Sequence, residues 1–309
     1  MLWILLALGG YVALAIVFVL DKMILTKTLD NPVVYTFYST IFMFAALLAF
    51  PFGVELLHGI DWLWAIVSGL GFGFGLWAMF VAVKKGEASH INPFIGAIIT
   101  IVIFVLASFF LGESLRMIEM GGIVVLAGAT LLLAFFNEKG FVSLDSSFLW
   151  GIIAAVLFAI SHVSAKYLYE LYPFFTGFVW TRATTGIVGL VCLFFPSVRQ
   201  TFHRTRHDSV ALSKAKDAGF HGVRGVMLVV SDKVLGVVGV VLIQLAIAIG
   251  SVTLVNALVG IQYALMFVII FLLTKFAPRI LKETFSRREI AVQTVAMIFV
   301  ILGSALFVL

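Results

Sequence analysis

Charged residues are scarce in this chain of 309 residues: aspartate, glutamate, lysine and arginine make up 11% of it, whereas hydrophobic residues make up 63%. A water-soluble domain carries roughly a quarter charged residues, which cover its exterior. With a mean hydropathy of +1.19, the chain has too few polar side chains to cover a soluble particle of its size. We therefore predict that lipid surrounds most of the folded protein.

The sequence also lacks features that would indicate a redox compartment, coupling to ATP hydrolysis or nucleic-acid binding. The single cysteine, Cys192, cannot form an internal disulfide, so the sequence gives no sign of the redox compartment. No G-x-x-x-x-G-K-[ST] pattern occurs, so direct coupling to ATP hydrolysis is not expected, and neither is a cofactor. The net charge of +5 does not indicate nucleic-acid binding, because the basic residues fall in loops and at helix ends, as in membrane proteins.

Ten apolar stretches are present that are long enough to cross a bilayer. A spanning helix needs about 20 mostly apolar residues. It must be a helix because the bilayer core offers no water to the backbone. The predicted spans are 2–25, 33–51, 62–83, 91–111, 117–136, 148–169, 174–196, 224–249, 256–276 and 291–309. They nearly exhaust the chain, so we predict an all-α membrane protein with ten transmembrane helices.

The two halves of the chain resemble each other. Segment 86–96 (GEASHINPFIG) aligns without a gap with segment 250–260 (GSVTLVNALVG). We therefore assign residues 1–137 to a first five-helix repeat and residues 147–309 to a second, which contains a polar loop at 197–221. Because five is an odd number, the second repeat must cross the membrane in the opposite sense. Inverted repeats are typical of secondary transporters, whose binding site lies where the repeats meet.

A series of short motifs also follows a fixed order along the chain. They are Leu111-Gly112-Glu113-Ser114-Leu115, Gly121-Gly122-Ile123, Leu126-Ala127-Gly128, Lys282-Glu283-Thr284 and Ile301-Leu302-Gly303. With the duplication, they resemble the drug/metabolite transporter superfamily, specifically its bacterial ten-helix EamA-type branch. Arg182, within Trp180-Thr181-Arg182-Ala183, resembles an arginine often found early in the second helix of this unit. The resemblance implies a transporter, with export as the expected direction and both termini in the cytoplasm.

Three ionisable residues lie deep inside predicted spans. Such residues are costly in a bilayer and are usually functional. At 1.5 Å per residue, Arg182 lies roughly 14 Å into its helix and Asp232 about 12 Å into the next, which runs in the opposite direction. We therefore predict an Arg182–Asp232 ion pair, which either joins two helices or belongs to a binding site. In the second case Asp232 or Lys233 faces a cavity and contacts the substrate or a coupling proton.

Five further polar or aromatic residues are candidates for substrate binding. His162 is either a proton relay or a hydrogen-bonded packing residue. Asn92 and Asn256 lie at predicted helix starts, where they would cap free backbone N–H groups or help to hold an anion. Trp180 and Gln262 are predicted either to line a cavity or to pack.

A second group of residues marks the predicted membrane surfaces. Lys22 and Lys166 are equivalent in the two repeats, so inversion would place them near opposite surfaces. They would form gates or ion pairs there, or extend their ammonium groups to the lipid headgroups. Asp21 would pair locally with Lys22. Glu113 and Glu283 are predicted to cap helices.

Two spacings leave alternatives open. Glycines at 69, 71, 73 and 75 have small-xxx-small spacing, which serves either a homodimer or helix packing within one bundle. His203 and His207 would share a helix face, but two ligands seldom make a metal site. We expect no metal here, and we interpret 197–221 as a solvated loop.

Basic residues collect in the loops that follow odd-numbered helices. Among them are Lys84, Lys85 and Lys275, together with five basic residues in 197–221. The positive-inside rule then places these loops in the cytoplasm and both termini outside. The family resemblance implies the reverse orientation.

The sequence thus favours a secondary transporter, with export as the expected direction, for a small polar metabolite such as an amino acid. It would work by alternating access between the inverted repeats, in the plasma membrane or a bacterial inner membrane. Its partners would be the small-molecule substrate and the lipid bilayer, with no nucleic acid, and it would be a monomer or a homodimer. The alternatives are a multidrug exporter of the same fold, a channel, or an intramembrane enzyme acting on a lipid-linked substrate through Ser161 and His162. We do not expect an enzyme, since no acidic partner for that pair is evident.

Overall fold

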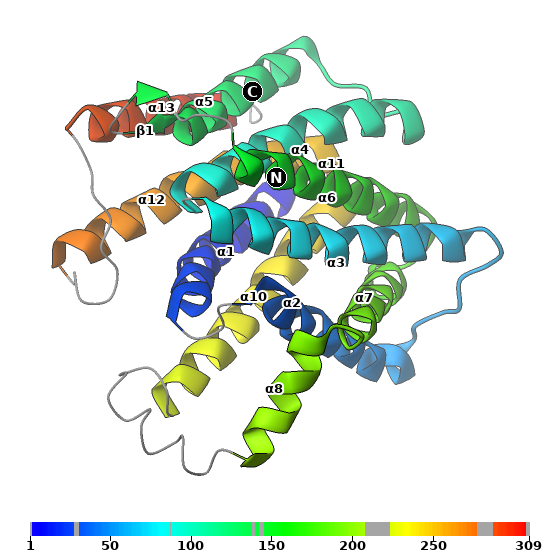
Figure 1. Ribbon diagram of the computed structural model, residues 1–309. Coiled ribbons are helices and arrows are strands. Elements are labelled where there is room, and N and C mark those ends of the chain that lie inside the picture. The colour runs from blue at the N-terminus through cyan, green and yellow to red at the C-terminus, as the bar shows by residue number, and fades with distance from the viewer. Residues whose placement is uncertain are drawn as a thin grey trace.

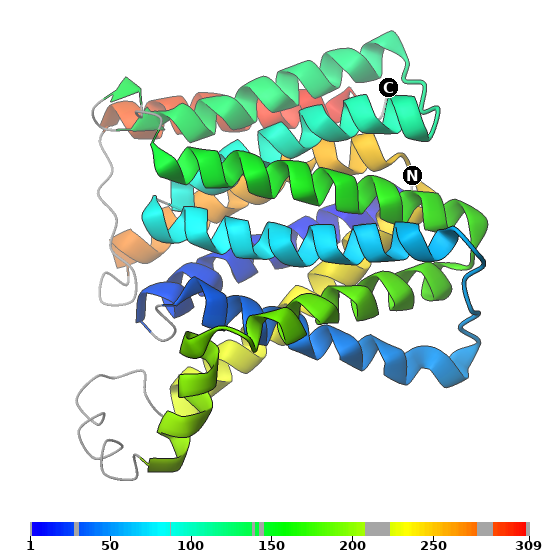
Figure 2. The same cartoon turned by 45° about the vertical axis from the view of Figure 1, so that its right-hand side comes forward.

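The computed structural model describes residues 2–27, 31–86, 88–137, 140–141, 145–207, 223–276 and 287–306, and most of these are helical. The helices are α1 (Leu2–Lys27), α2 (Pro32–Ile41), the 3-10 helix η1 (Phe42–Phe52), α3 (Asp61–Lys85), α4 (Ala88–Phe110), α5 (Met117–Phe135), α6 (Ser146–Leu171), α7 (Phe174–Cys192), α8 (Pro196–His207), α10 (Val223–Ile249), α11 (Val252–Ala257), α12 (Val259–Phe276) and α13 (Arg287–Ala305). The long helices run back and forth between the two ends of one bundle (Figures 1 and 2). Both termini lie at the same end of the bundle in Figure 2.

Eight helical segments of the described chain are long and apolar enough to cross a membrane. They are Leu2–Asp21, Pro32–Phe52, Asp61–Lys85, His90–Phe110, Ser146–Leu171, Phe174–Cys192, Met227–Ile249 and Val252–Phe276. Two more apolar helices, Met117–Leu132 and Ile290–Ala305, are shorter. Large apolar side chains such as Leu48 and Phe109 are exposed on the outside, as a surface in contact with lipid requires. The prediction of a multi-pass helical membrane protein is confirmed, while ten complete crossings stay a prediction.

Local chemistry explains where some helices begin. The side chain of Asn31 accepts a 2.9 Å hydrogen bond from the Val33 N–H, and Pro32 occupies the first position of α2, where its missing N–H costs nothing. Asp145 caps α6 in the same way, with a 2.8 Å bond from the Ser147 N–H. Hydrogen bonds from Ser147 to this carboxylate lower the pKa of Asp145.

Two predicted spans differ in detail. The second predicted span is α-helical only as far as Ile41 and continues as the 3-10 helix η1, which contains Pro51. The ninth begins earlier than predicted, with Ser251 as its N-cap, and is interrupted at Leu258 between α11 and α12. Hydropathy cannot reveal either feature, because apolar residues continue through both.

The predicted solvated loop at 197–221 is wrong in its first part, because Pro196–His207 forms the helix α8. His203 and His207 belong to that helix, while the rest of the loop and Glu283 lie outside the described residues. The sequence also did not predict a short antiparallel hairpin between α5 and α6, formed by β1 (Phe136–Asn137) and β2 (Gly140–Phe141).

The glycines of α3 serve close packing within the chain. A Cβ atom added at Gly69 would lie 2.0 Å from Thr184 Oγ1 of α7, and one at Gly73 would lie 2.6 Å from a methyl group of Val188. On the other face, Gly71 and Gly75 meet α6 in the same way. The small-residue spacing therefore brings α3 against both α6 and α7.

Candidate functional site

A cavity of about 550 Å³ lies between the two halves of the chain. Its walls come from α1, α2, η1, α3 and α4 of the first half and from α6, α10, α11 and α12 of the second. Most of the lining is aliphatic or aromatic, and the polar exceptions apart from tyrosines are Asp21, Ser39, Asn92, His162, Asp232, Lys233, Gln244, Asn256 and Gln262. An apolar pocket with a few convergent polar groups is the usual form of a small-molecule site.

Four side chains form what we call the charge cluster: Asp21 of α1, Asp232 and Lys233 of α10, which line one wall of the cavity, and Tyr35 of α2, which lies buried behind them. Lys233 Nζ lies 2.9 Å from Asp232 Oδ2 and 4.0 Å from Asp21 Oδ1. The Tyr35 hydroxyl donates to Asp21, lies 3.3 Å from Asp232 Oδ2, and accepts a 3.0 Å bond from Lys233. Two carboxylates thus share one ammonium and one hydroxyl group.

The charge cluster leaves one carboxylate oxygen without a partner. Asp232 is 1% exposed, and its Oδ1 atom has no hydrogen-bond partner among the described residues. Lys233 also donates a 3.2 Å bond to Ser39 Oγ, so its hydrogen-bonding capacity is already used within the protein. The buried carboxylate is therefore a candidate acceptor for a ligand that carries a donor group.

The predicted ion pair between Arg182 and Asp232 is wrong. Asp232 pairs with its own neighbour Lys233 instead. None of the three guanidinium nitrogens of Arg182 has a hydrogen-bond partner among the described residues, although the side chain is only 1% exposed. The guanidinium lies over the ring of Phe72, 4.2 Å from its centroid, and 5.7 Å from the ring centroid of Phe178. Depth in the membrane was a poor guide here, because Arg182 and Asp232 face different neighbours.

A second polar group lines the cavity at α4, α6, α11 and α12. His162 Nδ1 lies 2.9 Å from Asn256 Oδ1, and Asn256 Nδ2 donates a 2.8 Å bond to the Val252 carbonyl. Asn92 Oδ1 and Gln262 Nε2 are buried and have no hydrogen-bond partner among the described residues. Both unpartnered atoms belong to side chains that line the cavity, so they too are candidate ligand contacts.

The predicted capping roles of the two asparagines are wrong. Asn92 lies inside α4, which begins at Ala88, and Asn256 lies near the end of α11. The cap of α11 is Ser251, whose hydroxyl accepts a 3.0 Å bond from the Leu254 N–H. Both helices begin several residues before the asparagines.

Trp180 does not line the cavity, so cavity lining, the less expected of its two predicted roles, is wrong. Its indole N–H donates a 2.8 Å bond to the Glu55 carbonyl, and its ring packs against Trp62 with centroids 4.7 Å apart. These contacts join the start of α7 to the segment between η1 and α3. Packing, the alternative for this residue, describes it correctly.

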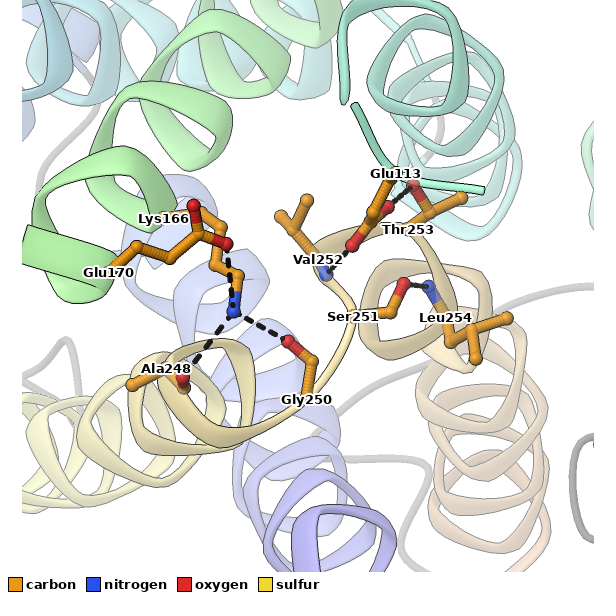
Figure 3. A network of polar contacts seen from close by, with 9 residues as sticks. All are labelled: Glu113, Lys166, Glu170, Ala248, Gly250, Ser251, Val252, Thr253 and Leu254. Carbon is orange, nitrogen blue, oxygen red and sulfur yellow. Dashed lines mark hydrogen bonds and ion pairs between the residues drawn. The ribbon is translucent and has the colours of Figure 1, made fainter. Parts of the chain in front are cut away.

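The predicted gate residues lie at two places. Asp21 lines the cavity within the charge cluster, and the side chain of Lys22 lies outside the described residues. Lys166 lies at one end of the bundle, where Figure 3 shows its ammonium directed at the last turn of α10. It donates to the carbonyls of Ala248 at 3.4 Å and Gly250 at 3.0 Å, and it pairs with Glu170 at 3.5 Å.

Figure 3 also shows Glu113 at the start of α11. Its carboxylate accepts a 2.9 Å bond from the Val252 N–H and a 2.5 Å bond from the Thr253 hydroxyl. The predicted capping role is confirmed, although the capped helix belongs to the other half of the chain. Lys166 and Glu113 together fix the turn between α10 and α11 from both sides.

Sequence reasoning missed Tyr35 and Ser39. Both belong to α2, an apolar helix in which hydroxyl side chains occur at 35, 36, 38, 39 and 40. Positions three and four apart share one face of a helix, so this hydroxyl pattern was a usable signal.

Comparisons with known proteins agree with this architecture. Residues 1–135 match the family model described as "EamA-like transporter family". A curated protein from Sinorhizobium sp, "Uncharacterized transporter in cobO 3'region", is 33% identical over 80 residues, which are 26% of this chain and 56% of that protein. A solved structure described as "Crystal structure of protein" has a TM-score of 0.64 and 16% identity, covers 97% of each chain, and shares the fold. The resemblance of the chain to the EamA-like transporters of the drug/metabolite transporter superfamily is therefore confirmed, on its first 135 residues.

Proposed function

We propose that the protein is a secondary transporter of a small zwitterionic metabolite, with amino acids as the first candidates and export as the direction. It would work by alternating access between two inverted five-helix repeats, 1–137 and 147–309. The observation that carries this proposal is the cavity between the two halves, whose wall includes two aspartates and a lysine, Asp21, Asp232 and Lys233. Ionisable groups at membrane depth are costly, and they usually mark the path of a substrate or an ion.

The packing of the helices supports the inverted repeat. If α1 to α5 correspond in order to α6, α7, α10, α11–α12 and α13, exchanging the repeats turns the α3–α6 contact into the α10–α1 contact. These are two of the most extensive helix contacts in the bundle. The same exchange leaves two contacts unchanged, the one between α5 and α13 and the one between α2 and α7. Both are present in the structure. In Figure 2, α1 and α6 run in opposite directions across the bundle. The shorter helices α5 and α13 would then be the fifth and tenth crossings.

Single residue contacts support the same exchange. The alignment of 86–96 with 250–260, continued backwards without a gap, matches Gly69 with Lys233. The alignment of Phe50-Pro51 with Phe195-Pro196 matches Ser39 with Thr184. Gly69 packs directly on Thr184, and Lys233 donates to Ser39 at 3.2 Å. The two contacts are therefore equivalent in the proposed repeat.

The helices approach each other more closely at the α3–α7 contact than at the equivalent α2–α10 contact. Such a difference is expected of a carrier in one of its two states. At the α3–α7 contact a glycine lets the helices touch, and α7 contributes no residue to the cavity lining. At the α2–α10 contact few backbone positions approach each other, and the side chain of Lys233 bridges the gap. Both α2 and α10 line the cavity. We infer that the second state closes α2 against α10 and parts α3 from α7.

The charges favour a zwitterion over a lipophilic cation. The charge cluster holds an unpartnered carboxylate oxygen for an ammonium group, yet Lys233 stands beside it and disfavours a large cation. A multidrug exporter would be expected to lack that lysine. For the rival enzyme, His162 bonds to Asn256, while the Ser161 hydroxyl lies near Ser68, so no nucleophile and base pair is formed between them.

The test is counterflow of labelled amino acids in proteoliposomes. Asp232→Asn removes one charge from the cavity, and we expect it to reduce counterflow by about tenfold or more, since the lost contact is ionic. Asp61→Asn is the matched control, because Asp61 accepts a bond from Tyr172 outside the cavity and its loss should leave counterflow nearly unchanged. Equal effects of the two variants, or an absence of saturable counterflow for every amino acid, would contradict the proposal.

A further inference from the structure

The charge of Arg182 is unbalanced in this structure. A guanidinium stays protonated in proteins and offers five N–H donors with no acceptor. Arg182 is 1% exposed, and its Nε, Nη1 and Nη2 atoms all lack a hydrogen-bond partner among the described residues. The faces of Phe72 and Phe178 compensate for only a small part of the lost hydration. A buried charge without a partner is strongly destabilising, so an anion that reaches Arg182 would be bound firmly.

Arg182 is one aromatic ring away from the cavity. It does not line the cavity, but Phe72, which lies under its guanidinium at 4.2 Å, does. Phe72 also packs against Phe158, with ring centroids 5.5 Å apart, and against His162, with ring centroids 6.5 Å apart. Both of these residues line the cavity. A change in the side-chain rotamer of Phe72 alone would connect the guanidinium with the cavity.

The charge cluster on the cavity wall can bind a positively charged group, whereas Arg182 can bind a negatively charged one. Two carboxyl groups, those of Asp21 and Asp232, face the single ammonium group of Lys233, and Asp232 Oδ1 is free to accept a bond. A molecule with one ammonium and one carboxylate group would satisfy both Asp232 and Arg182. Neither a simple amine nor a simple acid could do so.

We propose that Arg182 is a concealed anion site, covered by Phe72, that receives the carboxylate of the transported molecule while its ammonium group binds at Asp232. This inference rests on the proposed function and specifies its substrate class as zwitterions that carry both an ammonium group and an intact carboxylate. Phe72 acts as the cover of the site, and the aromatic, largely apolar lining of the cavity accommodates an apolar side chain.

The test compares L-phenylalanine with L-phenylalaninamide, which keeps the ammonium group and lacks the carboxylate. In the wild-type protein we expect the acid to bind about tenfold or more tightly than the amide, because only the acid pairs with the guanidinium. In Arg182→Gln the acid should weaken to the affinity of the amide, and the affinity of the amide should stay the same. Phe158→Leu is the control, since it changes an aromatic ring of the cavity that does not contact Arg182, and the preference for the acid should persist.

The outcomes separate the two proposals. Equal binding of acid and amide by the wild-type protein would overturn the role of Arg182 and leave the transporter standing. A preference for the acid that survives Arg182→Gln would do the same. If neither compound binds and no amino acid shows counterflow, the proposed function and this inference fail together.

A second measurement does not depend on ligand binding or on a folded Arg182 variant. Phenylglyoxal is a small apolar reagent that modifies guanidinium groups, and the modified peptide can be quantified by mass spectrometry. We expect slow modification of Arg182 in the wild-type protein and about tenfold faster modification in Phe72→Ala, because that variant removes the cover. Phe18→Ala, which removes a cavity-lining ring that packs against Tyr263, should leave the rate unchanged. Equal rates in the two variants would show that Phe72 does not cover the site.

Discussion

At the scale of single residues, Tyr35 organises the charge cluster. Its hydroxyl contacts both carboxylates and Lys233, and the ammonium of Lys233 also lies 4.3 Å from the centroid of the Tyr35 ring. Buried carboxylates need such donors, since each lost hydrogen bond to a charged group costs about 1–3 kcal/mol. We therefore expect Tyr35→Phe to lower the free energy of unfolding by that amount and to impair counterflow. Thermal denaturation of the purified protein measures the first effect.

Tyr38→Phe is the matched control for this prediction. Tyr38 belongs to the same helix and lines the cavity, but its hydroxyl makes no hydrogen bond to the described residues. Its replacement should change stability by less than about 0.5 kcal/mol. If the two variants were equally stable, the hydroxyl of Tyr35 would not hold the cluster together.

At this scale the sequence predicted which residues line the cavity better than it predicted which of them pair with each other. Six of the eight predicted substrate-binding residues line the cavity: Asn92, His162, Asp232, Lys233, Asn256 and Gln262. For Asp232 and Lys233, depth in an apolar helix was enough to find them, because a polar group in a bilayer must face the protein interior. The pairing of Arg182 was not predictable, since residue depth says nothing about which way a side chain faces around the helix axis.

At the scale of helices, α3 and α7 pack in direct contact at Gly69. A Cβ atom at Gly69 would lie 2.0 Å from Thr184 Oγ1 and 2.5 Å from the backbone nitrogen of Thr185, which cannot move aside. We expect Gly69→Ala to destabilise the described state by about 1–3 kcal/mol, the usual cost of overpacking. The same variant should favour the state in which α3 and α7 are apart. Thermal denaturation and phenylglyoxal modification of Arg182 measure these two effects.

Gly121 provides the control for a glycine in an exposed helix. A Cβ atom at Gly121 of α5 would meet no other atom within 4 Å. Gly121→Ala should therefore be neutral or stabilise the protein by up to about 1 kcal/mol, because alanine is the better helix former. Similar destabilisation in both variants would mean that the α3–α7 contact has no special role.

The existence of the helices followed from hydropathy alone, whereas their interruptions did not. All ten apolar stretches are helical over most of their described residues, because a bilayer core leaves the backbone no other solution. The early start of α11 at Val252 depends on tertiary contacts from the other half of the chain, because the Glu113 carboxylate accepts bonds from the Val252 N–H and the Thr253 hydroxyl. Local sequence patterns do not carry that information.

At the scale of the whole molecule, most of the basic residues described near the ends of the bundle lie at one end, with Lys166 among the exceptions. Lys84 and Lys85 end α3, Lys275 lies in the last turn of α12, and Arg199 lies in α8. In Figure 2 these three segments lie at the end opposite to the two termini. The positive-inside rule then places that end in the cytoplasm and both termini outside, against the orientation that the family resemblance implies.

Labelling of single cysteines from one side of the membrane tests this orientation. The only native cysteine is buried, so Cys192→Ala gives a background without reactive thiols. Lys85→Cys then places an exposed thiol at the end of α3, and His58→Cys places one in the loop that precedes α3. In intact cells, a membrane-impermeant maleimide should label the variant at 58 and spare the variant at 85, because the basic end faces the cytoplasm. The reverse pattern would show that the termini lie inside. The charge distribution would then reflect the long segment around α8, since long loops carry less weight in the rule than short ones.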